Sequence, residues 1–279
     1  VAGSTVVIGG GDAVKVHCHA EDPGPAISVG ATRGTLGQVN VRNMDEQRDE
    51  FSQAGVNEAA AIKVTVVAVA LGNGFERLLR NLGAAEIVAG GDTMNPSVKD
   101  ILDAVNAAPS NDVVVLPNNR NIIAAAELAA KTSDKRVEVV PTRSLPEGVA
   151  AMVTFDKDSG AADNAATMAA ALEDVRTGEV TEAIRSVTIN DVSVEPGQLI
   201  GLLDHDLVAA GDTIPQVAGS VLESAGVGDG DLITLYWGQP MTEQDAQATM
   251  AFLEGEYPGA ELELVHGGQP HYNLLMSIE

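Results

Sequence analysis

The stretch VTVVAVALGNGFERLLRNLGAAEIVAGG, residues 64–91, decides the fold class. Its first part, VTVVAVAL (64–71), is an unbroken β-branched run of the kind found in strands that are covered on both faces. FERLLRNLG (75–83) has the spacing of an amphipathic helix that ends at a glycine, and EIVAGG (86–91) is a second apolar strand. A strand, a helix and a strand in succession predict a parallel α/β sheet with right-handed crossovers.

The same alternation continues to the C-terminus. Up to residue 176 we expect strands at 113–117 and 137–141 and helices at 95–108, 121–132 and 161–176. In the first of these helices Asn95 is the expected cap, and Pro96 takes the first helical position. Beyond residue 180 we expect strands at 183–190, 198–204, 231–238, 260–268 and 274–278 and helices at 213–226 and 242–259.

Residues 1–50 have a different pattern. STVVIGGGDAVKVHCHA (4–20) alternates as two strands joined by a Gly-Gly-Gly-Asp turn, a helix is expected from Pro25, and a strand at 38–42. The predicted fold class is therefore α/β, with a partial β-rich domain ahead of a larger α/β domain. The predicted divisions are a β-rich part at 1–50, a connection at 51–63 and a domain at 64–279 with subdomains at about 64–160 and 180–279.

The composition limits the partners. The chain carries 40 acidic and only 16 basic side chains, a net charge of −24 that repels phosphate backbones and anionic lipid surfaces. We therefore expect no nucleic-acid partner. No apolar run approaches the ~20 residues of a membrane span, so stable membrane insertion is not expected. A single cysteine makes no internal disulfide and favours a reducing, cytoplasmic location.

Polar side chains gather after three of the predicted parallel strands, in DTMNPS (92–97), NNRN (118–121) and TRS (142–144). Ligands of open α/β sheets bind at the carboxyl ends of the strands. Ser, Thr and Asn also cap helices there, whereas an arginine at a helix start opposes the helix dipole and favours a functional face. The candidate ligand- or partner-binding residues are Thr93, Asn95, Ser97, Asn118, Asn119, Arg120, Thr142, Arg143 and Ser144.

Other features carry weaker signals. The Gly-Asn-Gly turn at 72–74 resembles part of a phosphate-binding loop, but it lacks the complete glycine spacing and the lysine of such loops. His271, near the C-terminus, is either a further partner-facing residue or an ordinary strand residue, and the sequence does not decide between them.

The stretch VKVHCHAEDPG (14–24) places His17 and His19 on one face of a predicted strand and Cys18 on the other. Two histidines at this spacing can share one Zn²⁺, but two ligands never complete a zinc site. A half-buried polar strand face explains the pair equally well. The two histidines are therefore candidate metal ligands, with the rest of the site undefined.

Taken together, seven segments resemble the bacterial fatty acid kinase ATP-binding subunit family, whose members carry a dihydroxyacetone-kinase-like domain. They follow the family order over nearly the whole chain: VKVHCHAEDPG (14–24), VNVRNMDEQ (39–47), GGDTMNPSVKDIL (90–102), VVVLPNNRNIIAAA (113–126), VEVVPTRSLPEGVAAM (137–152), RTGEVTEAIRSV (176–187) and GGQPHYNLLMSIE (267–279). The run of LPNN, PTRS and GGQP is the most specific part of the resemblance.

The resemblance implies an N-terminal kinase domain that holds ATP and Mg²⁺, a zinc-bearing middle domain and a C-terminal domain that engages a fatty-acid-binding subunit. This sequence begins inside the middle domain, so ATP and Mg²⁺ would enter only through the absent kinase domain. His17 and His19 correspond to the zinc histidines of the family, whose cysteine ligand lies upstream and is not Cys18. A homodimer through the middle domain is a further implication, as is a C-terminal domain with the fold of the fatty-acid-binding partner.

Three functions remain open from the sequence. In the first, the chain is the non-ATP-binding part of a two-component fatty acid kinase and docks the fatty-acid-binding subunit, so that the fatty acid carboxylate becomes an acyl phosphate. In the second, residues 63–279 are a stand-alone binding module for a fatty acid or a phosphate-bearing small molecule. In the third, the chain is a metal-dependent hydrolase that uses His17 and His19.

Overall fold

A computed structural model describes residues 4–8, 15–19, 22–37, 39, 62–91, 93–189 and 192–279. The strand expected at 38–42 and most of the connection expected at 51–63 lie outside these residues. The chain divides into two compact units, 1–62 and 63–279. Among the described helices, none combines the length and the apolar composition that crossing a bilayer requires.

The N-terminal unit contains the expected hairpin and helix. Strands β1 (Ser4–Ile8) and β2 (Lys15–His19) pair antiparallel. Helix α1 (Gly24–Arg33) follows, with Pro23 at its N-cap and Pro25 in its first turn, where the fixed backbone angle of proline is tolerated. None of the residues of α1 is buried, so this helix gains no stability from a core of its own.

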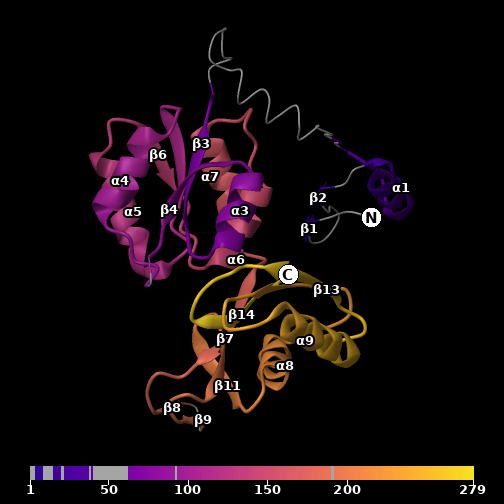
Figure 1. The fold of residues 1–279 in the computed structure, drawn as a ribbon. Helices are drawn as coiled ribbons and strands as arrows, with labels where there is room; N and C mark the ends of the chain where they lie inside the picture. Colours follow the sequence, from indigo (N-terminus) through magenta and orange to yellow (C-terminus); the bar gives the residue numbers. More distant parts are fainter. Residues whose placement is uncertain are drawn as a thin grey trace. The chain divides into compact units, whose positions relative to one another are not determined.

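The first sheet of the larger unit is entirely parallel, as the sequence predicts. Its strand order is β4 (Ala84–Ala89), β3 (Thr65–Ala70), β5 (Asp112–Leu116), β6 (Arg136–Val139). Figure 1 shows α4 (Val98–Ala107) and α5 (Ile123–Thr132) on one face and α3 (Asn73–Asn81) and α7 (Ala161–Ala170) on the other. All six residues of β3 are buried, which explains its unbroken apolar sequence.

The second sheet is mixed and has six strands. Its order is β11 (Asp206–Gly211), β10 (Leu199–Leu203), β7 (Arg176–Glu182), β14 (Tyr272–Ile278), β12 (Leu232–Trp237), β13 (Glu261–His266). Only β12 and β13 are parallel to each other. Helices α8 (Ile214–Ala225) and α9 (Glu243–Glu256) pack together against this sheet, and a small hairpin joins β8 (Val187–Ile189) to β9 (Val192–Val194).

Several expected elements differ in the second half of the chain. The strand expected at 183–190 is confirmed only over β8 (Val187–Ile189): β7 ends at Glu182, and Ile184 lies on a connection with 93% of its surface exposed. The helix expected to reach residue 176 stops at Ala170, because the chain must turn there to begin β7. Strand β11 has no counterpart among the expected elements. Only two residues separate its sequence, DLVAAG, from β10, so the sequence shows no clear boundary between the two strands.

Two corrections concern helix starts in the first half. Helix α4 is capped by Ser97 and not by Asn95: its side chain accepts a hydrogen bond from the Asp100 amide, and the Asp100 carboxylate accepts one from the Ser97 amide. This reciprocal pair forms a capping box, which a residue two positions earlier has no geometry to make. Helix α6 (Leu145–Val153), which follows directly after TRS, has no counterpart among the expected elements.

The Gly-Asn-Gly turn joins the two sheets. A Cβ atom on Gly74 would lie 1.9 Å from the carbonyl oxygen of His266, so only glycine fits against the loop after β13. The amide of Phe75 donates a hydrogen bond of 3.0 Å to the Gly267 carbonyl. The Phe75 ring packs on Tyr236, with 4.8 Å between ring centroids. This turn is therefore occupied by the second sheet and is not open to a phosphate group.

Candidate functional site

The strand order of the first sheet creates a switch point between β3 and β5. The chain leaves β3 towards β4 on one side and returns to place β5 on the other, and such points open a crevice at the carboxyl ends of the strands. A cavity of about 350 Å³ lies there. Its lining residues are Leu71, Thr93, Met94, Asn118, Asn119, Arg120, Asn121, Arg143, Ser144, Leu145, Glu179, Leu202, His205, Gln269, Tyr272 and Leu275.

Asn118 ties the strand ends of the first sheet together. Its side-chain amide donates a hydrogen bond of 2.8 Å to the Val69 carbonyl at the end of β3. Its backbone amide donates one of 2.9 Å to the hydroxyl of Thr142, after β6. Asn118 and Thr142 are both buried. Their side chains therefore hold three loops in place, and the structure puts Asn118 on the cavity wall with Thr142 behind it.

Asn119 and Asn121 shape the next part of the wall. The Asn119 side chain donates a hydrogen bond of 2.7 Å to the Met94 carbonyl and accepts one of 3.0 Å from the Asn121 amide. The second contact begins the short 3₁₀ helix η1 (Arg120–Ile122), which presents Arg120 to the cavity. These contacts position the loop after β5 against the loop after β4.

Ser144 connects the first sheet to the second. Its hydroxyl accepts a hydrogen bond from the Glu147 amide and so caps α6, and it lies 2.7 Å from the hydroxyl of Thr177 on β7. The amide of Arg143 donates a hydrogen bond of 2.6 Å to the Glu147 carboxylate. Burial raises the pKa of Glu147 despite this bond. The start of α6 is thus fixed to both sheets.

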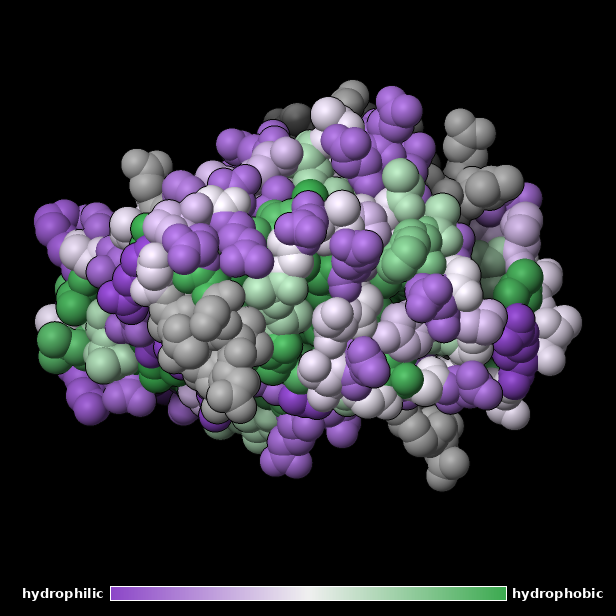
Figure 2. Space-filling model, turned by 90° about the horizontal axis from the view of Figure 1, so that it is seen from below, coloured by the Kyte–Doolittle hydropathy of each residue, from purple (hydrophilic) through white to green (hydrophobic). Residues whose placement is uncertain are grey.

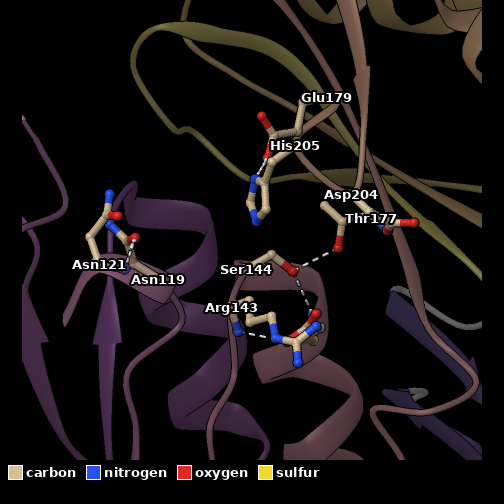
Figure 3. A network of polar contacts seen from close by, with 9 residues as sticks. Asn119, Asn121, Arg143, Ser144, Thr177, Glu179, Asp204 and His205 are labelled. Carbon is tan, nitrogen blue, oxygen red and sulfur yellow. Dashed lines mark hydrogen bonds and ion pairs between the residues drawn. The ribbon is translucent and has the colours of Figure 1, made fainter. Parts of the chain in front are cut away.

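The second sheet supplies an acid–imidazole pair to the opposite wall. Nδ1 of His205 lies 3.0 Å from a carboxylate oxygen of Glu179 (Figure 3). The hydrogen bond to Glu179 raises the pKa of His205, and partial burial opposes this effect only in part. In Figure 3 the imidazole points towards Ser144, with Asn119 and Asn121 at the other side of the space. The Nε2 atom is therefore the ring nitrogen left to meet a ligand.

Backbone strain is concentrated around this cavity. Five non-glycine residues in the described part of the chain have positive φ angles, and three of them, Met94, Asn118 and His205, line the cavity. The left-handed conformation costs about 1–2 kcal/mol for most side chains and less for asparagine. Strain of this kind is common at ligand sites, where the surrounding contacts hold it in place.

The predicted site residues divide into two groups. Thr93, Asn118, Asn119, Arg120, Arg143 and Ser144 share the cavity wall. Asn95 and Ser97 lie apart from it, Ser97 as a helix cap, and His271 is not among the lining residues although its carbonyl accepts a hydrogen bond of 2.7 Å from Thr181. A binding role for any of these residues stays a prediction.

Sequence reasoning missed Glu179, His205, Gln269 and Tyr272 on the far wall. The only local signal was the Asp204–His205 pair between two apolar runs, which is typical of a tight turn. The role of His205 in the cavity depends on Glu179, which lies on the neighbouring strand β7. The pairing of β7 with β10 cannot be predicted from the local sequence.

The candidate metal ligands lie in the other unit. His17 and His19 are both on β2, where His17 is paired in register with Val6 and His19 with Ser4. Their side chains are not among those that the structure describes. Within the described part of the chain, no three His, Cys, Asp or Glu side chains gather in a metal-binding group.

The sequence and fold match known proteins. Residues 65–279 match the FakA-like C-terminal domain of fatty acid kinase, and residues 1–51 match the FakA-like middle domain. The chain belongs to the FakA-like fatty acid kinase family. Protein YloV of Bacillus subtilis and an uncharacterized protein of Staphylococcus haemolyticus are each 33% identical over 99% of the chain. The chain spans about half the length of these relatives, 51% in both cases.

Solved structures share the fold of the larger unit. A DegV family protein from Corynebacterium glutamicum has a TM-score of 0.60 at 15% identity, over 78% of this chain and 97% of its own. A Thermotoga maritima protein with a reported fatty acid binding function has a TM-score of 0.55 at 11% identity, over 78% and 99%. The dihydroxyacetone kinase of C. freundii has a TM-score of 0.52 at 14% identity, over 87% and 57%. The predicted α/β fold class is confirmed.

Proposed function

We propose that this chain is the non-ATP-binding part of a two-component fatty acid kinase. In this proposal residues 63–279 dock a separate fatty-acid-binding protein, and a kinase domain outside this sequence phosphorylates the fatty acid carboxylate to an acyl phosphate. Family membership supports the kinase context. The fold that it shares with fatty-acid-binding proteins supports a domain that uses the same architecture to dock such a protein.

The observation that carries the proposal is a carrier fold with a filled core. Phe75, Leu79, Leu116, Ile122 and Met152 in the first subdomain have less than 2% of their surface exposed. An internal tunnel wide enough for an acyl chain would expose part of such side chains. The packing is therefore that of an ordinary protein interior. A carrier fold whose core is packed at these side chains favours recognition of a loaded carrier over storage of an acyl chain between them.

The surface is compatible with a charge-guided partner. In Figure 2 hydrophilic side chains are spread over the face seen from below, and hydrophobic ones form small groups between them. With a net charge of −24, such a protein attracts partners that present a basic face, and salt screens this attraction.

A competition assay tests this function. Adding the chain to a complete fatty acid kinase reaction, with a full-length relative and its loaded carrier, should lower acyl phosphate formation as the carrier is sequestered. ATP, Mg²⁺, carrier and this chain without the full-length relative should give no acyl phosphate, because phosphoryl transfer needs a positioned Mg²⁺–nucleotide site. Unchanged kinase rates at a large excess of chain would contradict docking, and turnover by the chain alone would contradict the assignment as the non-ATP-binding part.

Zinc in the N-terminal unit is a separate part of the proposal. His17 and His19 lie two apart on β2, a spacing that allows two imidazoles to share one tetrahedral ion whose remaining ligands come from elsewhere. Metal analysis of the purified chain should show zinc that is lost when both histidines are replaced by alanine. Equal zinc content before and after replacement would remove these residues from the site. Sedimentation of the same samples tests the expected homodimer through this unit.

A further inference from the structure

Two arginine side chains line the cavity at the switch point. Arg120 and Arg143 both line it, and both side chains are exposed. Within the described part of the chain, neither guanidinium makes a hydrogen bond or an ion pair; Arg143 bonds only through its backbone amide. Two guanidinium groups without a hydrogen-bonded partner among the described residues therefore face one cavity, in a chain with 40 acidic residues.

The other charged lining residues do not cancel this charge. Glu179 is the single acidic residue of the lining, and it is already paired with His205. If His205 is protonated, this pair is neutral and Nε2 of the ring is a donor; if it is neutral, two positive charges still face Glu179 alone. The lining residues therefore have a net positive charge in either state, which the Glu147 carboxylate next to Arg143 offsets in part.

Neutral donors complete the lining. Thr93 is exposed at the cavity, and the side-chain amide of Asn121 makes no hydrogen bond within the described residues. A guanidinium binds carboxylate and phosphate oxygens through two parallel hydrogen bonds, and hydroxyl and amide donors serve the remaining oxygens. This set of donors is suited to an oxyanion. The lining also holds two buried acceptors without a partner among the described residues, the side-chain oxygens of Asn118 and Gln269, which can accept from a hydroxyl group of the same ligand.

The size and walls of the cavity limit what else the ligand carries. A volume of about 350 Å³ accommodates a small molecule, and Leu71, Leu145 and Leu275 provide an apolar side for a short chain. Val69 and Leu116, on the strands that end at the cavity, have no exposed surface, so the space does not continue between them as a tunnel. We propose that this cavity binds a compact oxyanion, the carboxylate or phosphate group of a small molecule, through Arg120 and Arg143.

Calorimetry with defined probes tests this proposal on the purified chain, without any partner. The probes are inorganic phosphate, butyrate and oleate, which separate a free phosphate from a short carboxylate and both from a long acyl chain. Phosphate or butyrate should bind with saturation at one site. Arg120→Gln and Arg143→Gln should each weaken binding about tenfold, the loss of one charge-assisted pair of hydrogen bonds.

The matched control is Arg77→Gln, which removes the same charge from an exposed position on α3 that is not part of the cavity lining. It should leave probe binding unchanged, and all three variants should keep the melting temperature of the parent. Absence of saturable binding of phosphate and butyrate overturns the proposal. So does equal weakening by Arg77→Gln, or oleate binding more tightly than butyrate. Because no partner is present, these results are independent of whether the chain docks a carrier.

Discussion

The two walls of the cavity are built in different ways. The first wall consists of loops that follow parallel strands, and Asn118 holds their backbones in place. The second wall consists of side chains on a mixed sheet, where Glu179 in the middle of β7 meets His205 in the turn after β10. The first wall depends on where strands end, and the second on which strands pair. The cavity thus combines one wall that the local sequence predicts with a second wall that only the pairing of distant strands creates.

The contact between the two sheets at Gly74 should be the most sensitive position. Gly74→Ala places a methyl group 1.9 Å from the His266 carbonyl, and backbone on both sides must move to admit it. We expect a loss of about 3 kcal/mol in the free energy of unfolding, at the upper end of overpacking effects. Denaturant titration measures it. Gly255→Ala, in α9 with nothing within 4 Å of the added atom, is the matched control and should be neutral or slightly stabilising.

A second substitution isolates what Asn118 does for the first wall. Asn118→Ala loses the hydrogen bond to the Val69 carbonyl, leaves this buried acceptor unpaired and keeps φ at 55°. We expect destabilisation by about 2 kcal/mol. Asn118→Gly loses the same bond but accepts the positive φ freely, so it should be more stable than the alanine variant by about 1 kcal/mol. Equal stability of the two variants would show that the backbone strain is unimportant.

The second sheet has its own pH dependence. Burial raises the pKa of Glu263 on β13 to about 7, and the neighbouring carboxylates of Glu261 and Glu279 add to this effect. The folded state then binds more protons than the unfolded chain between its unfolded pKa and about pH 7, so stability falls as the pH rises through this window. Glu263→Gln should therefore raise stability by about 1 kcal/mol at pH 8, a value reduced for its partial exposure, and have little effect at pH 4. Thermal melts at the two pH values decide; a gain at pH 4 that equals the gain at pH 8 would contradict this explanation.

The smallest expected effect concerns the acid–imidazole pair. Glu179→Gln removes the charge that raises the pKa of His205, so this pKa should fall. The pair contributes stability below the unfolded pKa of the histidine and loses it as the pH rises through the raised folded pKa. The stability difference between parent and variant should thus shrink from pH 5 to pH 8. NMR titration of His205 gives the direct measurement, and an unchanged pKa would show that Glu179 does not control it.

The first wall could be predicted from the sequence, whereas the second wall could not. Apolar runs with helical spacing between them predicted the first sheet, and the rule about strand ends placed Arg120, Arg143 and Ser144 near one another. The register of β7 against β10 and β14 depends on contacts between residues far apart in the chain, which no local pattern encodes. Strand β7 itself was missed because RTGEVTE has little β propensity, and packing against α8 overrides this preference.

Helix caps show the same limit on a smaller scale. Asn95 and Ser97 are both good capping residues, and the Asp three positions after Ser97 decides between them. This signal was present in the sequence. In contrast, the contact of Ser144 with Thr177 across the two sheets was not, because it requires the position of α6 in the folded domain.

Direct binding of the chain to a fatty-acid-loaded carrier protein from the same organism is the measurement that tests the central claim most directly. Calorimetry should show one carrier per chain, with affinity that falls as salt is raised, and with no acyl phosphate formed when ATP and Mg²⁺ are present. Gly74→Ala, which disturbs the contact between the two sheets, should weaken binding, whereas Gly255→Ala should not. No heat of binding to either loaded or empty carrier, with a chain that melts cooperatively, would contradict the proposal that residues 63–279 are a docking domain.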